Sequence, residues 1–253
     1  MAAVKLEDLT FEEHGFLLCY PKPSPEEFEQ RLRELEELGV EALELSGGKQ
    51  LGKFQVLGKG TSALVLKALK GGERFALKVR RVDAGRPSLL KEAELTLKAN
   101  QVKVGPKLHA FTVNMLLLEL VEGELFLEWL RRLEAKPEHR RLALNFLSEL
   151  LLQCRRLDQV GIDHGELSRA SKHVLVRGVS PVILDFGKAS VERRPANVTA
   201  ITQFLVVKRA ASLELERILG VSWPREKVFQ ALREYKFNPS EEAFQRVLRL
   251  FEG

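Results

Sequence analysis

The 253-residue sequence is poor in cysteine and has no hydrophobic run long enough to cross a membrane. Its two cysteines, Cys19 and Cys154, show neither metal-ligand spacing nor a disulfide framework, so we expect reduced thiols. The longest apolar runs, such as NMLLLELV, fall far short of the roughly 20 residues that a transmembrane helix needs. The first residues, MAAVKLEDLTFEEHG, are acidic and lack the core of a signal peptide. These absences predict a cytoplasmic protein with no membrane partner.

Charge is unevenly divided along the chain. Residues 1–50 carry 5 Lys and Arg against 12 Asp and Glu, a net charge of −7. The whole chain has 40 basic and 35 acidic side chains, so residues 51–253 carry 35 against 23, a net charge of +12. Such a basic body is typical of proteins that bind a polyanion, although a well-solvated surface can have the same composition.

A small acidic α/β unit is predicted for residues 1–50. Ser24 is a typical helix N-cap and is followed by proline and then by glutamate, while apolar residues recur on one face from Phe28 to Leu38. Strand-like runs flank this helix, with FLLCY (16–20) before it and VEALEL (40–45) after it. A glycine pair at 47–48 then breaks the chain. We therefore expect a domain boundary near residue 50.

Strand and turn patterns alternate in residues 51–122. The runs KFQVLG and ALVLKALK flank a glycine-rich turn, and Gly71 and Gly72 make a hairpin into RFALKVR. A helix is expected from a cap at Ser88 through Asn100, and LHAFTV and NMLLLELV complete a five-stranded sheet. Residues 123–253 are mostly helical, and HVLV and PVILD are short strands within them. With 45% hydrophobic residues, the chain can bury a substantial core.

The triplet Asp185, Phe186 and Gly187 directly follows a short apolar strand, which gives a carboxylate a rigid support for holding a metal ion. Upstream come the glycine turn LGKGTSALVLKA, a strand lysine in ERFALKVRR, a helix that carries Glu92, and the loop GIDHGELSRASKHVLV. In this order they are the parts of a protein-kinase-type phosphotransfer site. The predicted fold class is α+β, a two-lobed protein-kinase-like fold with an N-terminal lobe (51–122), a compact helical C-terminal lobe (123–253) and the small N-terminal α/β unit.

The glycine turn is a candidate nucleotide-binding element. Glycines here let the backbone approach a triphosphate closely, and the hydroxyl groups that follow them add donors. The third glycine of the usual kinase pattern is replaced by Ala63. The candidate ATP-binding residues of the turn are Gly58, Lys59, Gly60, Thr61 and Ser62.

Lys78 lies inside a strand between two apolar residues, so its ammonium group needs a partner. Glu92, fourteen residues later on the following helix, is suitable, and the pair would orient the α- and β-phosphates of ATP. Glu94 is the alternative partner, but its position favours a solvated role. The stretch LLLELVEG is interpreted as the hinge, where backbone groups of Glu119 and Val121 would bind adenine because an edge strand leaves such groups unpaired. An ordinary edge strand is the alternative.

The order and spacing of these motifs over about residues 53–215 resemble the compact, atypical protein-kinase-like family that includes the RIO and Bud32 kinases. The runs HGELSRASKHVLV, DFGKAS and RRPANVTAITQFL are similar to a group of archaeal predicted kinases. That group includes the RNA kinase that phosphorylates the 2′-hydroxyl of a uridine in tRNA. The resemblance implies ATP and Mg²⁺ as cofactors and tRNA as the substrate.

In this family pattern, the catalytic loop supplies an aspartate base and, five residues later, a metal-binding asparagine. Glu166 occupies the base position and is expected to accept the substrate hydroxyl proton or to orient that hydroxyl. The asparagine is absent: counting five residues gives Ser171, while alignment of the HVLV strand gives His173, a poor direct ligand for Mg²⁺. Asp185 is therefore expected to carry more of the metal binding.

Other residues of the loop have less defined roles. Lys172 and Arg169 could neutralise charge on the transferred phosphoryl group or hold an anionic acceptor. Asp163 is an alternative base. His164 is more typical of a structural residue that is hydrogen-bonded near the Asp-Phe-Gly turn.

The segment after the Asp-Phe-Gly triplet lacks an A-P-E sequence, so we expect no platform for positioning a peptide. Lys188, Arg193 and Arg194 suit the phosphates of a nucleic acid. Ion pairs with Glu192 or with the acidic first fifty residues are the alternative. Asn197 is expected to cap a helix and to contribute to the same RNA-binding surface.

Taken together, these features predict an ATP- and Mg²⁺-dependent kinase that acts on a hydroxyl of RNA, a ribose 2′-OH of a uridine in tRNA. Its predicted catalytic residues are Lys78, Glu166, Lys172 and Asp185. A protein Ser/Thr kinase of the RIO type is the first alternative. A nucleotide-binding scaffold without catalysis is the second, because the metal-binding asparagine is lost and the base position holds glutamate. No obligate protein partner is inferred.

Overall fold

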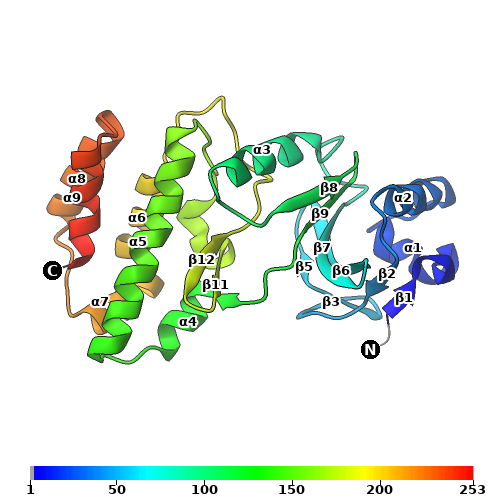
Figure 1. Cartoon of the computed structure of the whole chain (residues 1–253), viewed down its shortest axis with the longest axis horizontal. Coiled ribbons are helices and arrows are strands. Elements are labelled where there is room, and N and C mark those ends of the chain that lie inside the picture. Colours follow the sequence, from blue (N-terminus) through cyan, green and yellow to red (C-terminus); the bar gives the residue numbers. More distant parts are fainter. Residues whose placement is uncertain (1–2, 253) are drawn as a thin grey trace. The chain divides into compact units, whose positions relative to one another are not determined.

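The computed structural model describes residues 3–252 and has an α+β fold with antiparallel sheets (Figure 1). The chain divides into two compact units. The first, which we call the sheet unit, extends to Leu97 and includes Pro106–Val121. The second, the helical unit, consists of Lys98–Gly105 and the chain from Glu122 onward. Among the described residues, no helix has the length and apolar character needed to span a membrane.

The sheet unit is built around a seven-stranded sheet with strand order β1-β2-β6-β7-β9-β8, and β5 pairs with β6. Its strands are β1 (Ala3–Lys5), β2 (Ala42–Glu44), β5 (Gly58–Lys59), β6 (Ala63–Lys70), β7 (Glu73–Arg80), β8 (Leu108–Phe111) and β9 (Met115–Glu119). A separate hairpin is formed by β3 (Lys49–Leu51) and β4 (Phe54–Val56). The helices are the 3₁₀ turn η1 (Leu6–Asp8), α1 (Phe11–Leu18), α2 (Pro25–Glu37) and α3 (Leu90–Gln101), whose last turn belongs to the helical unit.

The first fifty residues follow the predicted pattern only in part. Helix α2 begins as expected, because the Ser24 hydroxyl accepts a hydrogen bond from the Glu27 N–H at 3.3 Å and Pro25 is the first helical residue. The prediction of a strand at residues 16–20 was wrong, since α1 runs to Leu18. A five-residue apolar run fits a strand or a buried helix equally well, and here the preceding residues continue a helical turn through it.

Residues 3–50 do not form a core of their own. Strand β2 pairs with β6, with Leu43 opposite Ala68, so the N-terminal segment extends the sheet. Leu35 and Leu43 belong to the same buried cluster as Leu66 and Leu77. The sheet therefore has seven strands instead of the five that were predicted, and there is no boundary at residue 50 within the sheet unit.

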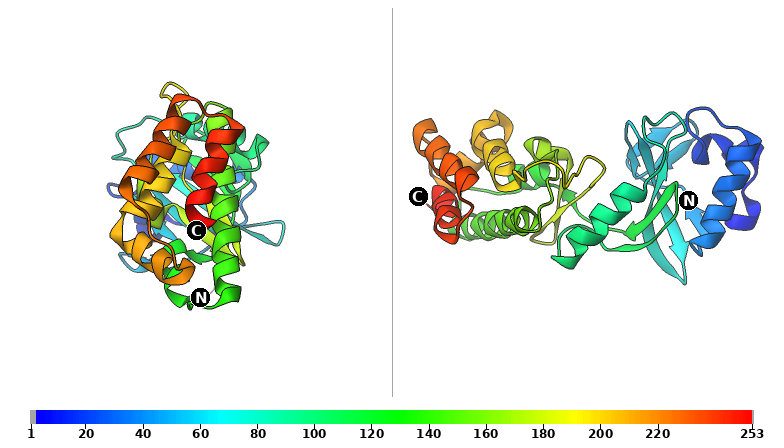
Figure 2. Two further views of the ribbon diagram at one scale, coloured as in Figure 1. Left: turned by 90° about the vertical axis from the view of Figure 1, so that its left-hand side faces the viewer. Right: turned by 90° about the horizontal axis from the view of Figure 1, so that it is seen from above.

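The two faces of the sheet have different coverings. Successive side chains of β7 point to opposite faces of the sheet, so Leu77 and Val79 point into the large apolar cluster that includes residues of the N-terminal helices. Lys78 has the opposite orientation and is paired in register with Leu116 of β9, which packs with Leu89 and other residues near α3. In Figures 1 and 2, α1 and α2 lie on one side of this sheet and α3 lies on the other. The N-terminal segment thus covers one face and leaves the Lys78 face to α3.

Two local predictions in this unit can be compared directly with the structure. Gly71 and Gly72 join β6 to β7 with φ of 57° and 77°, the left-handed conformations that a two-residue hairpin turn requires. The predicted helix over 88–100 is present, but it begins at Leu90, so Ser88 does not occupy the capping position. The backbone bond from the Ala93 N–H to the Leu89 carbonyl places the cap at Leu89 instead.

The helical unit contains most of the helices of the chain. Its elements are β10 (Glu124–Leu125), α4 (Phe126–Arg132), α5 (Pro137–Gln159), η2 (Leu167–Lys172), β11 (Val174–Arg177), β12 (Ser180–Ile183), α6 (Asn197–Val207), α7 (Arg209–Leu219), α8 (Arg225–Phe237) and α9 (Glu241–Glu252). Strands β10, β11 and β12 form a small sheet in that order. Helix α5 packs against α6, α7, α9 and β12, which makes it the central helix of the unit (Figure 2).

A buried polar network fastens α2 to the turn between β8 and β9. The Glu34 carboxylate accepts hydrogen bonds from the Thr112 hydroxyl, from the Asn114 N–H at 3.0 Å and from the Asn114 side-chain amide at 2.6 Å. The fully buried Arg31 donates to the backbone carbonyl of Asn114 at 3.4 Å. Arg80 donates to the side-chain oxygen of Asn114 at 2.6 Å. Burial raises the pKa of Glu34, but these hydrogen bonds outweigh it and hold the pKa below its usual value. The network fixes the N-terminal segment on the sheet.

This network predicts a large effect for Glu34→Ala. The substitution leaves the buried donors of Thr112 and Asn114 without their acceptor, so we expect a loss of roughly 3 kcal/mol in the free energy of unfolding, measured with guanidinium chloride. Glu36→Ala, on an exposed position of the same helix, is the matched control and should change stability by no more than about 0.5 kcal/mol. Equal effects of the two substitutions would show that the network contributes nothing.

Candidate functional site

In the sheet unit, Lys78 and Glu92 form a buried ion pair. The Lys78 Nζ lies 2.5 Å from the Glu92 Oε1, and the two residues are only 6% and 4% exposed. Arg86 approaches the other carboxylate oxygen of Glu92 at 2.9 Å. Glu94 is exposed, as predicted, so Glu92 is the partner of the strand lysine. Two buried charges are retained only where they are paired, and here the pair lies at one end of α3 beside β7.

The glycine turn lies between β5 and β6 of the same unit. The Gly60 N–H donates to the Ala63 carbonyl at 2.9 Å and closes the turn. Neither Gly58 nor Gly60 has a positive φ, so backbone strain does not explain their presence. A Cβ atom on Gly60 would lie 3.2 Å from the Ala63 carbonyl oxygen, so the turn is narrow. Thr61 and Lys59 are exposed at its tip.

Two arginines that the sequence did not single out hold this turn. Arg81 donates to the Gly60 carbonyl at 2.9 Å, and Arg86 donates to the Ser62 hydroxyl at 3.1 Å. Because Arg86 also contacts Glu92, it links the glycine turn to the Lys78–Glu92 pair. Both arginines lie beyond the end of β7, and no motif in the sequence indicated their role.

Tyr20 connects the N-terminal segment to the same turn. The Lys59 ammonium lies 4.9 Å from the centre of the Tyr20 ring, and the Arg81 guanidinium lies 4.7 Å from it. The Tyr20 carbonyl accepts the Val82 N–H at 3.0 Å. Cation–π contacts of this kind restrain long basic side chains. Lys59 and Ser62, both predicted to contact ATP, therefore already have protein partners.

The prediction for adenine binding needs a correction. Strand β9 is not an edge strand, because it lies between β7 and β8. The Glu119 N–H donates to the Lys107 carbonyl at 2.8 Å, and the Glu119 carboxylate accepts from the Lys107 N–H at 3.1 Å. The Glu119 N–H is thus occupied. Val121 lies beyond the end of β9, outside the described strands, so it stays a candidate for adenine binding.

In the helical unit, two histidines position the residue before Asp185. The Leu184 N–H donates to the His173 carbonyl at 2.8 Å, while the Leu184 carbonyl lies 3.0 Å from the His164 Nε2. The His164 ring also packs against Phe186, with the ring centres 5.1 Å apart. His164 is therefore the structural residue that the sequence indicated. Burial lowers the pKa of its imidazole to about 4.

Gly165 follows His164 in the loop, and only glycine fits there because the backbone of Lys188 passes close to it. Its φ is 82°, and a Cβ atom there would lie 2.7 Å from the Lys188 carbonyl oxygen. A side chain at this position would separate the loop from the segment that follows Asp185. Reciprocal backbone bonds between Asp163 and Ser190, at 2.9 and 2.8 Å, complete this contact.

Glu166, His173 and Asp185 converge in this unit. One ligand-type atom from each lies within 4.8 Å of the others, and the His173 Nε2 lies 3.8 Å from a Glu166 carboxylate oxygen. Asp185 is exposed and has a φ of 68°, which is uncommon for a residue other than glycine and is often found at functional sites. Two carboxylates and an imidazole are a donor set that fits a divalent cation. Ser171, half-buried in η2, is outside this set.

The predicted RNA-contacting residues are not equivalent. Arg169, Lys172 and Lys188 are exposed. Arg193 pairs with Asp163 at 2.7 Å, although its side chain is still 51% exposed. The sequence suggested Glu192 or the acidic first fifty residues as ion-pair partners, and Asp163 is neither. The same ion pair engages Asp163, the alternative base. Arg194 donates to the backbone carbonyls of residues 236 and 237.

The predictions for Asn197 were wrong. Asn197 is only 1% exposed, so it cannot contact RNA. It is also not the helix cap, because α6 begins at Asn197 and the N-cap position is Ala196. The Asn197 side chain accepts the His164 N–H at 2.8 Å and donates to Asp158 at 2.7 Å and to the Ile162 carbonyl at 2.6 Å. Asn197 therefore has a structural role: it is hydrogen-bonded to the start of the loop that contains Glu166.

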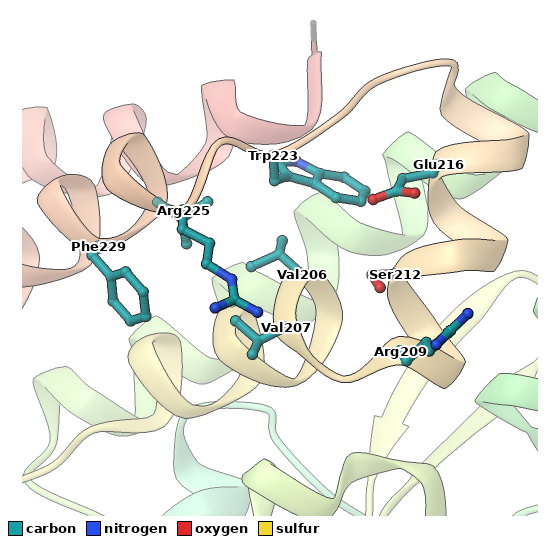
Figure 3. Close-up of a pocket in the computed structure, with 9 residues that line it drawn as sticks. Val206, Val207, Arg209, Ser212, Glu216, Trp223, Arg225 and Phe229 are labelled. Atoms are coloured by element: carbon teal, nitrogen blue, oxygen red, sulfur yellow. The ribbon is translucent and has the colours of Figure 1, made fainter.

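A pocket of about 300 Å³ opens elsewhere in the helical unit (Figure 3). It is lined by Val206, Val207, Arg209, Ser212, Glu216, Trp223, Arg225, Val228 and Phe229. The Trp223 indole donates to the Leu250 carbonyl at 2.7 Å, which fixes the ring at the pocket wall. Arg225 extends toward Val207, and Phe229 is 46% exposed. The lining thus combines two arginines and one glutamate with two aromatic rings. No motif in the sequence indicated this pocket.

Comparison with known proteins gives no family assignment. No protein-family model matches the chain, and a search of curated proteins finds no significant match. The functional interpretation therefore depends on two groups of residues: the Lys78–Glu92 pair with its glycine turn, and the Glu166, His173 and Asp185 cluster.

The buried imidazole of His164 predicts a pH dependence of stability. Its pKa in the folded state, about 4, lies below the ordinary value of 6.5, so the unfolded chain takes up the proton first. This contribution to stability is complete above pH 6.5 and is lost as the pH falls toward 4. We expect the wild type to lose up to about 3 kcal/mol more than His164→Phe between pH 7 and pH 4, measured by urea unfolding.

His139→Phe, at a histidine of α5, serves as the control for the exchange of histidine for phenylalanine itself. The same pH dependence in His164→Phe and in the wild type would contradict the assignment of this effect to His164.

Proposed function

We propose that this protein is an ATP-dependent kinase that transfers the γ-phosphoryl group to a hydroxyl of RNA, a ribose 2′-OH of a uridine in tRNA. The observation that carries the proposal is the buried Lys78–Glu92 pair, linked through Arg86 to a narrow glycine turn. A buried lysine of this kind, paired with a helical carboxylate, orients the phosphates of ATP in protein kinases. The two-lobed kinase-like arrangement is part of this proposal.

The sheet unit would bind the nucleotide. Lys78 would contact the α- and β-phosphates while Glu92 fixes its direction, and the backbone of Gly58 and Gly60 would lie against the phosphates. Arg81 and Arg86 already hold the turn in one conformation. Binding then costs less conformational entropy than it would with a mobile loop.

The helical unit would supply the groups for phosphoryl transfer. Glu166 would accept the proton of the 2′-OH as its oxygen bonds to the γ-phosphorus, and the bond from that phosphorus to the β,γ-bridging oxygen would break to release ADP. Asp185 would hold a divalent cation, which when bound neutralises charge on the phosphates. Lys172, which is exposed in η2, would offset charge on the transferred group.

Two features favour RNA as the acceptor. Residues 51–253 carry a net charge of +12, as counted above, which suits a polyanionic substrate. The pocket whose lining includes Arg209, Arg225, Trp223 and Phe229 offers cationic and stacking groups for an unpaired nucleotide. The resemblance to an archaeal RNA kinase, noted on the sequence, points to the same substrate class.

Transfer of label from γ-labelled ATP to purified tRNA tests this proposal. We expect label on tRNA with the wild type and a loss of roughly a hundredfold or more in Asp185→Asn and in Glu166→Gln, because each removes a group that acts in the transfer step. Glu166→Gln should bind ATP as tightly as the wild type does. Glu138→Gln, an exposed residue at the start of α5, is the control and should retain full activity.

The label can also reveal the alternatives. Label that appears only on protein would reject the RNA substrate and favour a protein Ser/Thr kinase. ATP binding without transfer to either would favour a scaffold. Activity that persists in Asp185→Asn would point to a contaminating kinase.

A further inference from the structure

We propose that the metal site of the helical unit is a mixed nitrogen and oxygen site, in which the His173 imidazole and the Asp185 carboxylate bind the ion and favour Mn²⁺ over Mg²⁺. That this ion serves phosphoryl transfer rests on the function proposed above. The assignment of the ligands does not, because it rests on the convergence of Glu166, His173 and Asp185 within 4.8 Å.

The backbone fixes the distance between the two ligands. His173 directly follows η2 as its C-cap, and its carbonyl accepts the N–H of Leu184, the residue directly before Asp185. This hydrogen bond continues the β11–β12 ladder beyond its last pair, Val174 and Ile183, so the two ligands lie at the same end of that ladder. Glu166 lies on the remaining side, 3.8 Å from the His173 Nε2.

The His173 ring is suited to bind an ion. Its side chain is only 11% exposed, and its Nδ1 is buried with no hydrogen-bond partner among the described residues. The neighbouring His164 differs, because its Nε2 lies 3.0 Å from the Leu184 carbonyl and is engaged in holding the loop. The His173 ring thus makes no comparable structural hydrogen bond, and its Nε2 lies 3.8 Å from a Glu166 carboxylate oxygen.

The donor types decide which ion is favoured. Mg²⁺ takes oxygen ligands in a near-ideal octahedron and keeps several waters, so an imidazole in place of an amide oxygen weakens its site. Imidazole nitrogen binds first-row transition-metal ions better than it binds Mg²⁺, and among these ions Mn²⁺ shares the preference of Mg²⁺ for carboxylate and water oxygens. A chain with histidine where the family pattern has asparagine should therefore bind Mn²⁺ in preference to Mg²⁺. This changes the cofactor expected from the sequence resemblance.

The substitution His173→Asn tests the inference, because it replaces the imidazole with an amide oxygen. Mn²⁺ alone is added to the nucleotide-free full-length protein, and binding is followed by the loss of the electron paramagnetic resonance signal of free Mn²⁺, with Mg²⁺ as competitor. We expect one Mn²⁺ per chain in the wild type. The ratio of Mg²⁺ to Mn²⁺ dissociation constants should fall by roughly tenfold or more in His173→Asn.

Pulsed resonance experiments provide a second readout that a merely structural role would not change. Bound Mn²⁺ in the wild type should show modulation from a coordinated nitrogen, and this should be absent in His173→Asn. His109→Asn, at an exposed position of β8 in the sheet unit, is the control and should leave both the ratio and the nitrogen signal unchanged. Asp185→Asn should weaken the binding of both ions.

The outcomes separate this inference from the proposed function. Transfer of label to tRNA by the wild type, together with an unchanged metal ratio in His173→Asn, would overturn the metal assignment alone. Nitrogen-coordinated Mn²⁺ in a protein that transfers no phosphoryl group would support the metal assignment and remove the proposed function. Thermal unfolding of His173→Asn should match the wild type within a few degrees, and a nitrogen signal that survives in this folded variant would overturn the inference.

Discussion

The buried ion pair between Lys78 and Glu92 is the constraint on which the sheet unit depends. Charges are costly to bury, and this pair is held in place by a third group, Arg86, that also contacts the glycine turn through Ser62. The opposite face of β7 is covered by the acidic N-terminal helices, which share one apolar core with the sheet. Covering that face leaves the lysine face to α3. Residues 3–50 therefore have a structural role: they complete the sheet, and through Tyr20 they restrain the turn.

A comparable constraint operates in the helical unit, where the backbone of Leu184 is held on both sides by histidines. This fixes the point at which Asp185 leaves the strand, and it brings Glu166 and His173 to the same place. Asn197 and Asp158 support the loop from α6 and α5. Burial raises the pKa of Asp158. Each of the two groups of candidate functional residues is thus held in place by contacts within its own unit.

Much of this could be predicted from the sequence, for reasons that are local. The hairpin at Gly71 and Gly72, the strand lysine with its glutamate partner and the order of the motifs all follow from short-range patterns. The errors concern long-range pairing. Whether β9 is an edge strand depends on β8, and whether residues 3–50 form a separate domain depends on the pairing of β2 with β6. Asn197 looked like an exposed cap because no pattern could reveal that Asp158, 39 residues earlier, lies beside it. The roles of Arg81 and Arg86 also depend on tertiary contacts.

Direct measurement of nucleotide binding tests the central claim that Lys78 faces a triphosphate. A non-hydrolysable ATP analogue is titrated calorimetrically into the wild type, into Lys78→Met and into Lys67→Met, a partly buried lysine on the neighbouring strand β6 that pairs with Glu44. We predict one site per chain in the wild type, an unchanged site in Lys67→Met and an affinity lower by roughly tenfold or more in Lys78→Met. No binding by the wild type, or equal binding by all three proteins, would contradict the account.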